Sequence, residues 1–98
     1  MNWAKNYILE LEKAGVCKFR PRGNSMVGKI NSGQLVTVHK IPLSDYKIGD
    51  ITLCKVNGNI YLHLIKAIQG DRFLIGNNRG GTNGWTKTLY GKCVEVAN

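Results

Sequence analysis

Apolar residues recur at helical spacing only near the start of the chain. The stripe consists of Trp3, Tyr7, Ile8 and Leu11, which fall close to an i, i+4, i+8 pattern. The lysines and glutamates between them can face water. Asn2 is a suitable N-cap residue, and Gly15 can end a helix in a left-handed conformation. The pattern therefore predicts one short amphipathic helix over residues 2–14.

Beyond residue 16 the pattern changes to short β-type segments separated by glycines. The predicted strands are 16–20, 35–40, 50–56, 60–68, 72–76 and 92–96. Asn57-Gly58 joins the third and fourth of them, and Asn-Gly is a strong hairpin signal. These features predict a mainly β protein with one N-terminal helix.

The length and composition favour one globular domain. The chain has 98 residues, of which 43% are hydrophobic, enough for a single modest core. We expect one domain over residues 1–98, with an N-terminal helix in 1–15 and a β region in 16–98. No apolar run approaches the roughly 18–20 residues of a membrane span, and no signal-peptide pattern is visible. These observations favour a soluble cytoplasmic protein without a membrane partner.

The residues that bind metals and form disulfides are few and scattered. Cys17, Cys54 and Cys93 are an odd number without C-x-x-C spacing, and the chain has two histidines. We therefore expect no disulfide framework, no metal and no cofactor.

The formal net charge of +8 is large for a chain of this length. Such a charge favours binding to an acidic protein or to nucleic acid. The basic residues are spread along the chain except for the short cluster of Lys18, Arg20 and Arg22. A solvated basic surface without a specific partner explains the same composition, and no nucleic-acid-binding motif is visible.

Residues 23–30 contain the most informative motif, Gly-Asn-Ser-Met-Val-Gly-Lys-Ile, followed by Ser32-Gly33 and a β-branched segment. This motif resembles the hallmark Gly-x-Ser-Met-x-Pro-x-Ile/Leu of the superfamily that contains the LexA-type repressors and the signal peptidases. The resemblance puts Ser25 at the nucleophile position. Gly28 stands where the family usually has proline.

Weaker similarities follow in the family's order, so that the resemblance covers about residues 19–96. They are the segments 48–51, 60–65, 70–78 and 90–96. The resemblance implies a small half-open barrel or an assembly of coiled sheets. It also implies a serine peptidase, which binds an extended peptide as an added strand.

The resemblance implies His63 as the general base, as in the Ser-His branch of the superfamily. Histidine is neutral near pH 7 and can accept the serine proton. Lys66 is the alternative base, because most relatives use lysine. Strand alternation puts the two side chains on opposite faces, so only one can point at Ser25 without a bulge. A hydrogen-bonding distance near 3 Å between Ser25 and His63 would favour histidine.

By the same resemblance, Gly23, Ser25 and Met26 form the nucleophile turn, and the Ser25 N–H is the oxyanion donor. Gly23 lacks the hydroxyl that bacterial signal peptidases carry at this position. Histidine-type relatives have an aspartate in the late loop, where this chain has Asn77, Asn78 and Asn83. These asparagines are candidates to orient His63 or to line the groove.

Two functions follow as hypotheses. The first is a serine peptidase that acts on a partner protein, because Ala14-Gly15 lies too close to Ser25 for the family's self-cleavage site. The second is a peptidase-fold binding module with weak or no catalysis, directed at an acidic protein or nucleic acid. Either function would suit a phage or mobile-element accessory protein.

Overall fold

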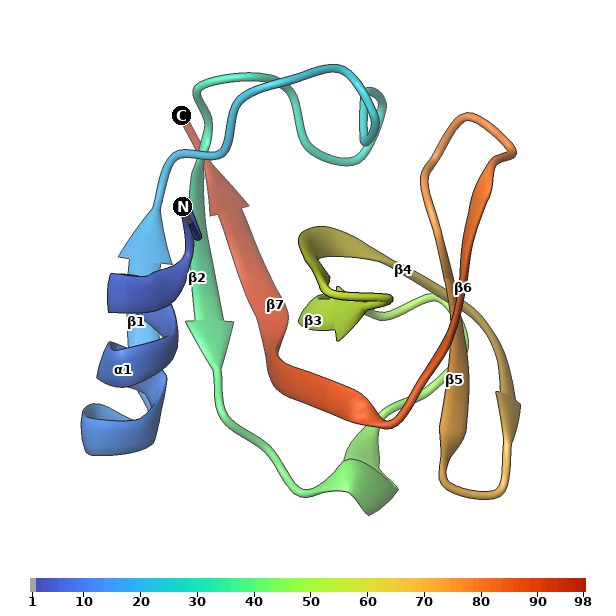
Figure 1. Ribbon diagram of the computed structural model, residues 1–98. Coiled ribbons are helices and arrows are strands. Elements are labelled where there is room, and N and C mark those ends of the chain that lie inside the picture. Colours follow the sequence, from blue (N-terminus) through green and yellow to red (C-terminus); the bar gives the residue numbers. More distant parts are fainter. Residues whose placement is uncertain (1) are drawn as a thin grey trace.

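The computed structural model describes residues 2–98 (Figure 1). Residue 1, which belongs to the expected domain and N-terminal segment, lies outside the described residues. The elements in chain order are α1 (Lys5–Ala14), β1 (Val16–Phe19), β2 (Leu35–His39), the short 3-10 helix η1 (Leu43–Asp45), β3 (Ile51–Val56), β4 (Asn59–Gln69), β5 (Arg72–Gly76), β6 (Thr82–Thr86) and β7 (Thr88–Ala97). Within residues 2–98, neither helix has the length and apolar character needed to cross a membrane.

The strands form one antiparallel sheet in the order β1-β2-β7-β3-β4-β5-β6. The sheet is not closed, because β1 and β6 are its two edges. It curls strongly, since the Thr86 hydroxyl of β6 donates a hydrogen bond to the Lys55 carbonyl of β3. The expectation of a mainly β, half-open barrel with one short N-terminal helix is confirmed.

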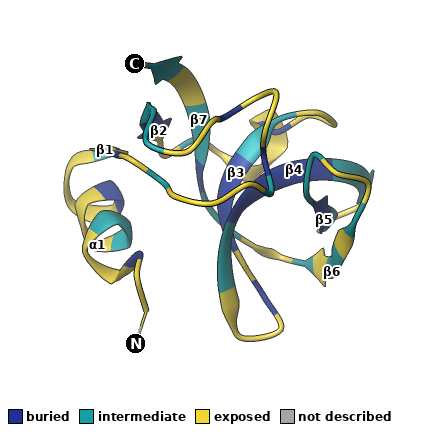
Figure 2. Cartoon of the chain, turned by 90° about the horizontal axis from the view of Figure 1, so that it is seen from above, coloured by how far each residue is buried: buried dark blue, intermediate teal, exposed yellow. Residues whose placement is uncertain are grey.

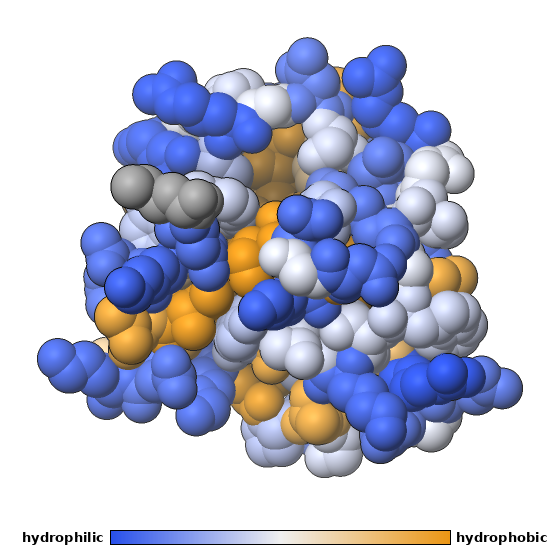
Figure 3. Space-filling model, viewed as in Figure 1, coloured by the Kyte–Doolittle hydropathy of each residue, from blue (hydrophilic) through white to orange (hydrophobic). Residues whose placement is uncertain are grey.

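The sheet encloses two hydrophobic clusters on either side of β3 and β4. The first packs α1 against the sheet and contains Leu11, Phe19, Val36, Leu53 and Leu62 among its buried residues. The second fills the curl of β3 to β6. Figure 2 shows that buried residues concentrate in β3 and β4, whereas much of α1 is exposed. In Figure 3, apolar surface lies in a recess between hydrophilic residues.

The helix ends as expected but begins later. Gly15 caps its C-terminus at φ 78°, and the Gly15 N–H donates to the Leu11 carbonyl. Its N-cap position is Ala4 rather than Asn2. The Asn2 side chain instead accepts a hydrogen bond from the Ala4 N–H, at 2.8 Å. This local turn, two residues long, uses the asparagine outside the helix, so the prediction of Asn2 as N-cap was wrong.

Two features of the β region differ from the expected strands. The stretch 76–85, which reads as a loop, contains strand β6, and β7 begins four residues before the expected 92–96. Glycines and asparagines weaken the strand signal in this stretch, and pairing with β5 overrides that weak propensity. The second feature is a bulge in β4 at Lys66, between Ile65 and Ala67. The bulge shifts the alternation, so that Ile68 joins Ile65 in the second cluster.

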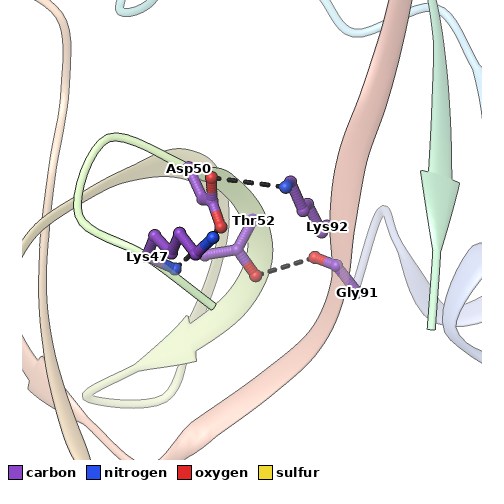
Figure 4. A network of polar contacts seen from close by, with 5 residues as sticks. All are labelled: Lys47, Asp50, Thr52, Gly91 and Lys92. Carbon is purple, nitrogen blue, oxygen red and sulfur yellow. Dashed lines mark hydrogen bonds and ion pairs between the residues drawn. The ribbon is translucent and has the colours of Figure 1, made fainter. Parts of the chain in front are cut away.

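Thr52 stabilises the centre of the sheet. It is fully buried in β3, between His63 of β4 and Lys92 of β7. Its hydroxyl donates to the Gly91 carbonyl at 2.7 Å (Figure 4). Beside it, Asp50 accepts a hydrogen bond from the Lys47 N–H and pairs with the Lys92 ammonium at 3.5 Å. These contacts hold β7 and the start of β3 together behind the strand that carries His63.

We expect Thr52→Val to lower the free energy of unfolding by about 1–3 kcal/mol, because it removes a buried hydrogen bond without changing side-chain shape. Chemical denaturation measures the change. Thr88→Val is the matched control, because Thr88 is exposed and its hydroxyl makes no hydrogen bond within residues 2–98. Equal effects of the two substitutions would contradict the role of the Thr52 hydroxyl.

Candidate active site

Ser25 lies in a tight turn that two apolar side chains hold in place. The N–H groups of Lys29 and Ile30 donate to the Met26 carbonyl at 3.0 and 2.7 Å. The Met26 and Ile30 side chains, at the two ends of this turn, are both buried in the first cluster. Burial of these two residues fixes the turn against the sheet and leaves Ser25 at the surface of the groove described below.

Two glycines give this turn its shape. Gly23 has φ 117° and Gly28 has φ 98°, backbone conformations that residues with side chains rarely adopt. Proline is restricted to φ near −65°, so it cannot replace Gly28 in this conformation. The backbone of this turn therefore differs at Gly28 from that of a turn with the family's usual proline at the same position.

The connection between β5 and β6 braces the Ser25 turn through Asn78. The Asn78 N–H donates to the Ser25 carbonyl, and the Asn78 side-chain amide donates to the Val27 carbonyl, both at 2.8 Å. The Asn77 side chain accepts hydrogen bonds from the N–H groups of Arg79 and Gly81, so it shapes its own loop. Asn78 therefore supports the Ser25 turn, Asn77 holds the loop that carries Asn78, and neither hydrogen-bonds to His63.

His63 lies between Ser25 and Asn83. Its Nε2 is 3.0 Å from the Ser25 Oγ, and its Nδ1 is 2.7 Å from the Asn83 Oδ1. Because an amide oxygen only accepts hydrogen bonds, Nδ1 carries the proton and Nε2 is free to accept the Ser25 hydroxyl proton. The Tyr61 ring stacks on the imidazole at a centroid distance of 4.9 Å. Three contacts thus hold the ring in one orientation.

The electrostatic surroundings of His63 favour the neutral ring. The side chain is 7% exposed, and this burial lowers its pKa from the ordinary 6.5. The hydrogen bond to Asn83 acts in the opposite direction but is the smaller influence. At neutral pH the imidazole is therefore a base with an available lone pair on Nε2.

Lys66 lies away from this pair. It is the bulged residue of β4, and its aliphatic chain lies along Gly76, where an added Cβ would come within 2.9 Å of the Lys66 Cε. Lys66 does not line the groove that contains Ser25 and His63. The bulge thus turns the lysine toward β5 rather than toward the serine.

A groove of about 460 Å³ leads away from Ser25 and His63. One wall is the segment that runs from Phe19 to the Ser25 turn, and the other is the first half of β4, from Ile60 to His63. Trp3 and Tyr7, from the N-terminal segment and α1, close the far end. Figure 2 shows α1 and the first half of β4 on opposite sides of this space.

The remaining candidate groups lie outside this arrangement. Burial raises the pKa of the Cys17 thiol to about 11 and that of Cys54 to about 12, so neither is a thiolate at neutral pH. Cys93 is half-buried, and His39 is exposed at the end of β2. In the described part of the chain, no three His, Cys, Asp or Glu residues come together as a metal site.

The family model described as Peptidase S24-like matches residues 2–83. The chain belongs to this family. A search of curated proteins found no match. Membership in the Peptidase S24-like family agrees with the resemblance to the LexA and signal peptidase superfamily and with the fold.

The region matched by the Peptidase S24-like model contains Ser25, His63 and Asn83 and ends within β6. The sequence singled out Ser25 and His63 as a pair, but it left Asn83 as one of three asparagines. Tyr61 and Trp3 were not expected near the site. Only Tyr61 carried a sequence signal, because it lies two residues before His63 and so shares its face of the strand.

The lowered pKa of His63 predicts a pH dependence of stability. The unfolded chain binds a proton at this histidine at higher pH than the folded chain does, so protonation destabilises the fold. The stability that the neutral His63 ring contributes is fully present above pH 6.5. It is lost as the pH falls from 6.5 through the lower pKa that His63 has in the folded protein. We expect NMR to show that His63 titrates below pH 6.5. Thermal unfolding should show that the protein loses stability as the pH falls below 6.5.

Two variants test the cause of this shift. His63→Gln should remove the part of the pH dependence that belongs to the imidazole. Asn83→Asp should raise the pKa of His63, because a carboxylate at Nδ1 stabilises the imidazolium. An unchanged titration of His63 in Asn83→Asp would contradict the hydrogen bond between these two side chains.

Proposed function

We propose that this Peptidase S24-like protein is a serine peptidase that uses Ser25 as nucleophile and His63 as general base. The observation that carries the proposal is the continuous contact from the Ser25 Oγ through the His63 ring to the Asn83 Oδ1, with distances of 3.0 and 2.7 Å. A serine hydroxyl is a weak nucleophile unless a base lies within hydrogen-bond reach, and a third group that orients the base completes the arrangement.

The proposed reaction proceeds through an acyl-enzyme. The His63 Nε2 takes the hydroxyl proton as the Ser25 Oγ attacks the peptide carbonyl carbon. The same proton then passes to the leaving amine as the peptide C–N bond breaks. A water molecule gives a proton to Nε2, attacks the acyl carbon and releases the acid, and the proton returns to Ser25. Asn83 holds the productive tautomer, but a neutral amide stabilises the imidazolium less than a carboxylate does, so we expect slow turnover.

Backbone donors near Ser25 supply the oxyanion site in this proposal. Within residues 2–98, the Ser25 N–H donates no hydrogen bond to another group of the protein. It is therefore available to the negative oxygen that forms on the attacked carbonyl. Gly23 adds no side-chain donor, and its own N–H donates to the Ser32 hydroxyl oxygen at 3.3 Å.

The free edge of β4 supports binding of the substrate as an added strand. Residues 59–64 pair with β3 on one side, whereas pairing with β5 on the other side begins only at Leu64. Residues 59–63 therefore have an unpaired edge, which leads directly to His63 and borders the groove. An extended peptide can form backbone hydrogen bonds there. We include a cytoplasmic location in the proposal, because three free cysteines suit a reducing compartment.

A second candidate is a binding module that keeps the groove without efficient catalysis. The observations that favour it are the amide rather than a carboxylate at His63 and the absence of a side-chain hydroxyl at Gly23. The net charge of +8 suits an acidic protein or nucleic acid as its partner.

Reaction with a fluorescent fluorophosphonate separates the two candidates. We expect the wild-type protein to be labelled, Ser25→Ala to show no labelling, and His63→Ala to be labelled about 100-fold more slowly, the size of a lost general base. In-gel fluorescence against time measures the rates.

Two controls make the result specific. Lys66→Met keeps the aliphatic chain along Gly76 and should be labelled like wild type. Ser44→Ala removes a hydroxyl from η1, outside the groove, and should also be labelled normally. A folded wild-type protein that is not labelled would favour the binding module, and loss of labelling in Lys66→Met would make lysine the base.

A further inference from the structure

The end of the groove farthest from Ser25 is built from aromatic side chains of the N-terminal part of the chain. The Tyr7 and Phe19 rings are stacked, with centroids 4.4 Å apart and an interplanar angle of 16°. The Trp3 indole meets the Phe19 ring edge-on at 5.7 Å. Phe19 is buried, whereas Trp3 is 49% exposed and therefore offers a large apolar surface to the groove.

A hydrogen bond fixes Trp3 at the free edge of β4. The indole Nε1–H donates to the Ile60 carbonyl at 3.3 Å. This carbonyl lies in the unpaired stretch 59–63, so Trp3 occupies a hydrogen-bonding position that an added strand would otherwise use. Trp3 thus marks the place where backbone pairing along β4 stops and contact with an aromatic surface begins.

The separation between Ile60, which Trp3 contacts, and His63, which contacts Ser25, indicates which residue of a bound peptide would meet Trp3. Ile60 and His63 are three residues apart on one strand, which corresponds to about 10 Å at 3.3 Å per residue. The edge is open only on this side of His63, because β4 pairs with β5 from Leu64 onward. The aromatic surface therefore meets a side chain about three residues from the scissile bond, on one side of that bond.

The charge of the groove restricts the rest of the peptide. Arg20 and Arg22 line it, and none of its lining residues is acidic. The Arg20 guanidinium donates to the Gly33 carbonyl at 2.8 Å, which holds that side chain at the rim. Acidic side chains in the bound peptide complement these two cations.

We propose that Trp3, Tyr7 and Phe19 form a specificity subsite for a large apolar side chain, about three residues from the scissile bond of an extended acidic peptide. The proposal rests on the proposed peptidase function for its reference point, the scissile bond. It adds to that function the class of peptide that the groove accepts.

Cleavage of a positional-scanning library of internally quenched peptides, in a background rich in alanine and glutamate, tests the subsite. We expect kcat/KM to be about tenfold or more higher with Phe than with Ala about three residues from the cut, on one side only, as burial of an aromatic side chain implies. Trp3→Ala should abolish this preference, whereas Trp3→Phe, which keeps a ring, should retain most of it. Trp85→Ala is the matched control, because Trp85 is similarly exposed but packs under Arg72 outside the groove.

Binding of the same peptides to Ser25→Ala, measured by fluorescence anisotropy, separates failure of the subsite from failure of the catalytic proposal. Tighter binding of Phe peptides that depends on Trp3, without cleavage by wild type, supports the subsite and overturns the peptidase. Cleavage without a preference that depends on Trp3 overturns the subsite alone. The subsite is also overturned if no library peptide is cleaved or bound.

Discussion

The site depends on the way in which β4 changes its pairing partner along its length. Its first half pairs with β3 and its second half pairs with β5, and the change occurs at Leu64, next to His63. One edge of the first half therefore stays open beside His63, while contacts with Ser25, Tyr61 and Asn83 keep the ring itself buried. A strand with two neighbours along its whole length would leave no open edge beside His63.

Burial and hydrogen bonding act in opposite directions on His63, and the balance suits a base. Desolvation favours the neutral ring, whereas the Asn83 oxygen favours the charged ring to a smaller degree. The same amide also determines which nitrogen faces Ser25. An asparagine at this position therefore gives orientation without strong charge stabilisation, a combination that is compatible with slow catalysis and with a groove used mainly for binding.

The N-terminal helix contributes to the core and to the groove at the same time. Leu11 and Ala4 are buried against the sheet, which fixes the position of the helix. Trp3 and Tyr7 then extend from the same segment to the end of the groove. Because the anchoring residues and the exposed aromatic residues lie on one short segment, stability of the first cluster and the shape of the groove are linked.

The sequence by itself determined the fold class, the helix end at Gly15, the positions of most strands along the chain and the Ser25 motif, because these depend on local periodicity, turn chemistry and one short motif. It also paired Ser25 with His63 through a family resemblance. It did not predict β6, the bulge at Lys66 or the choice of Asn83 among three asparagines. Each of these depends on pairing between strands: β6 forms because β5 offers an edge, and Asn83 reaches His63 because β6 follows β5 in the curled sheet. Local pattern specifies which residues have the right chemistry, and only the tertiary structure decides which of them meet.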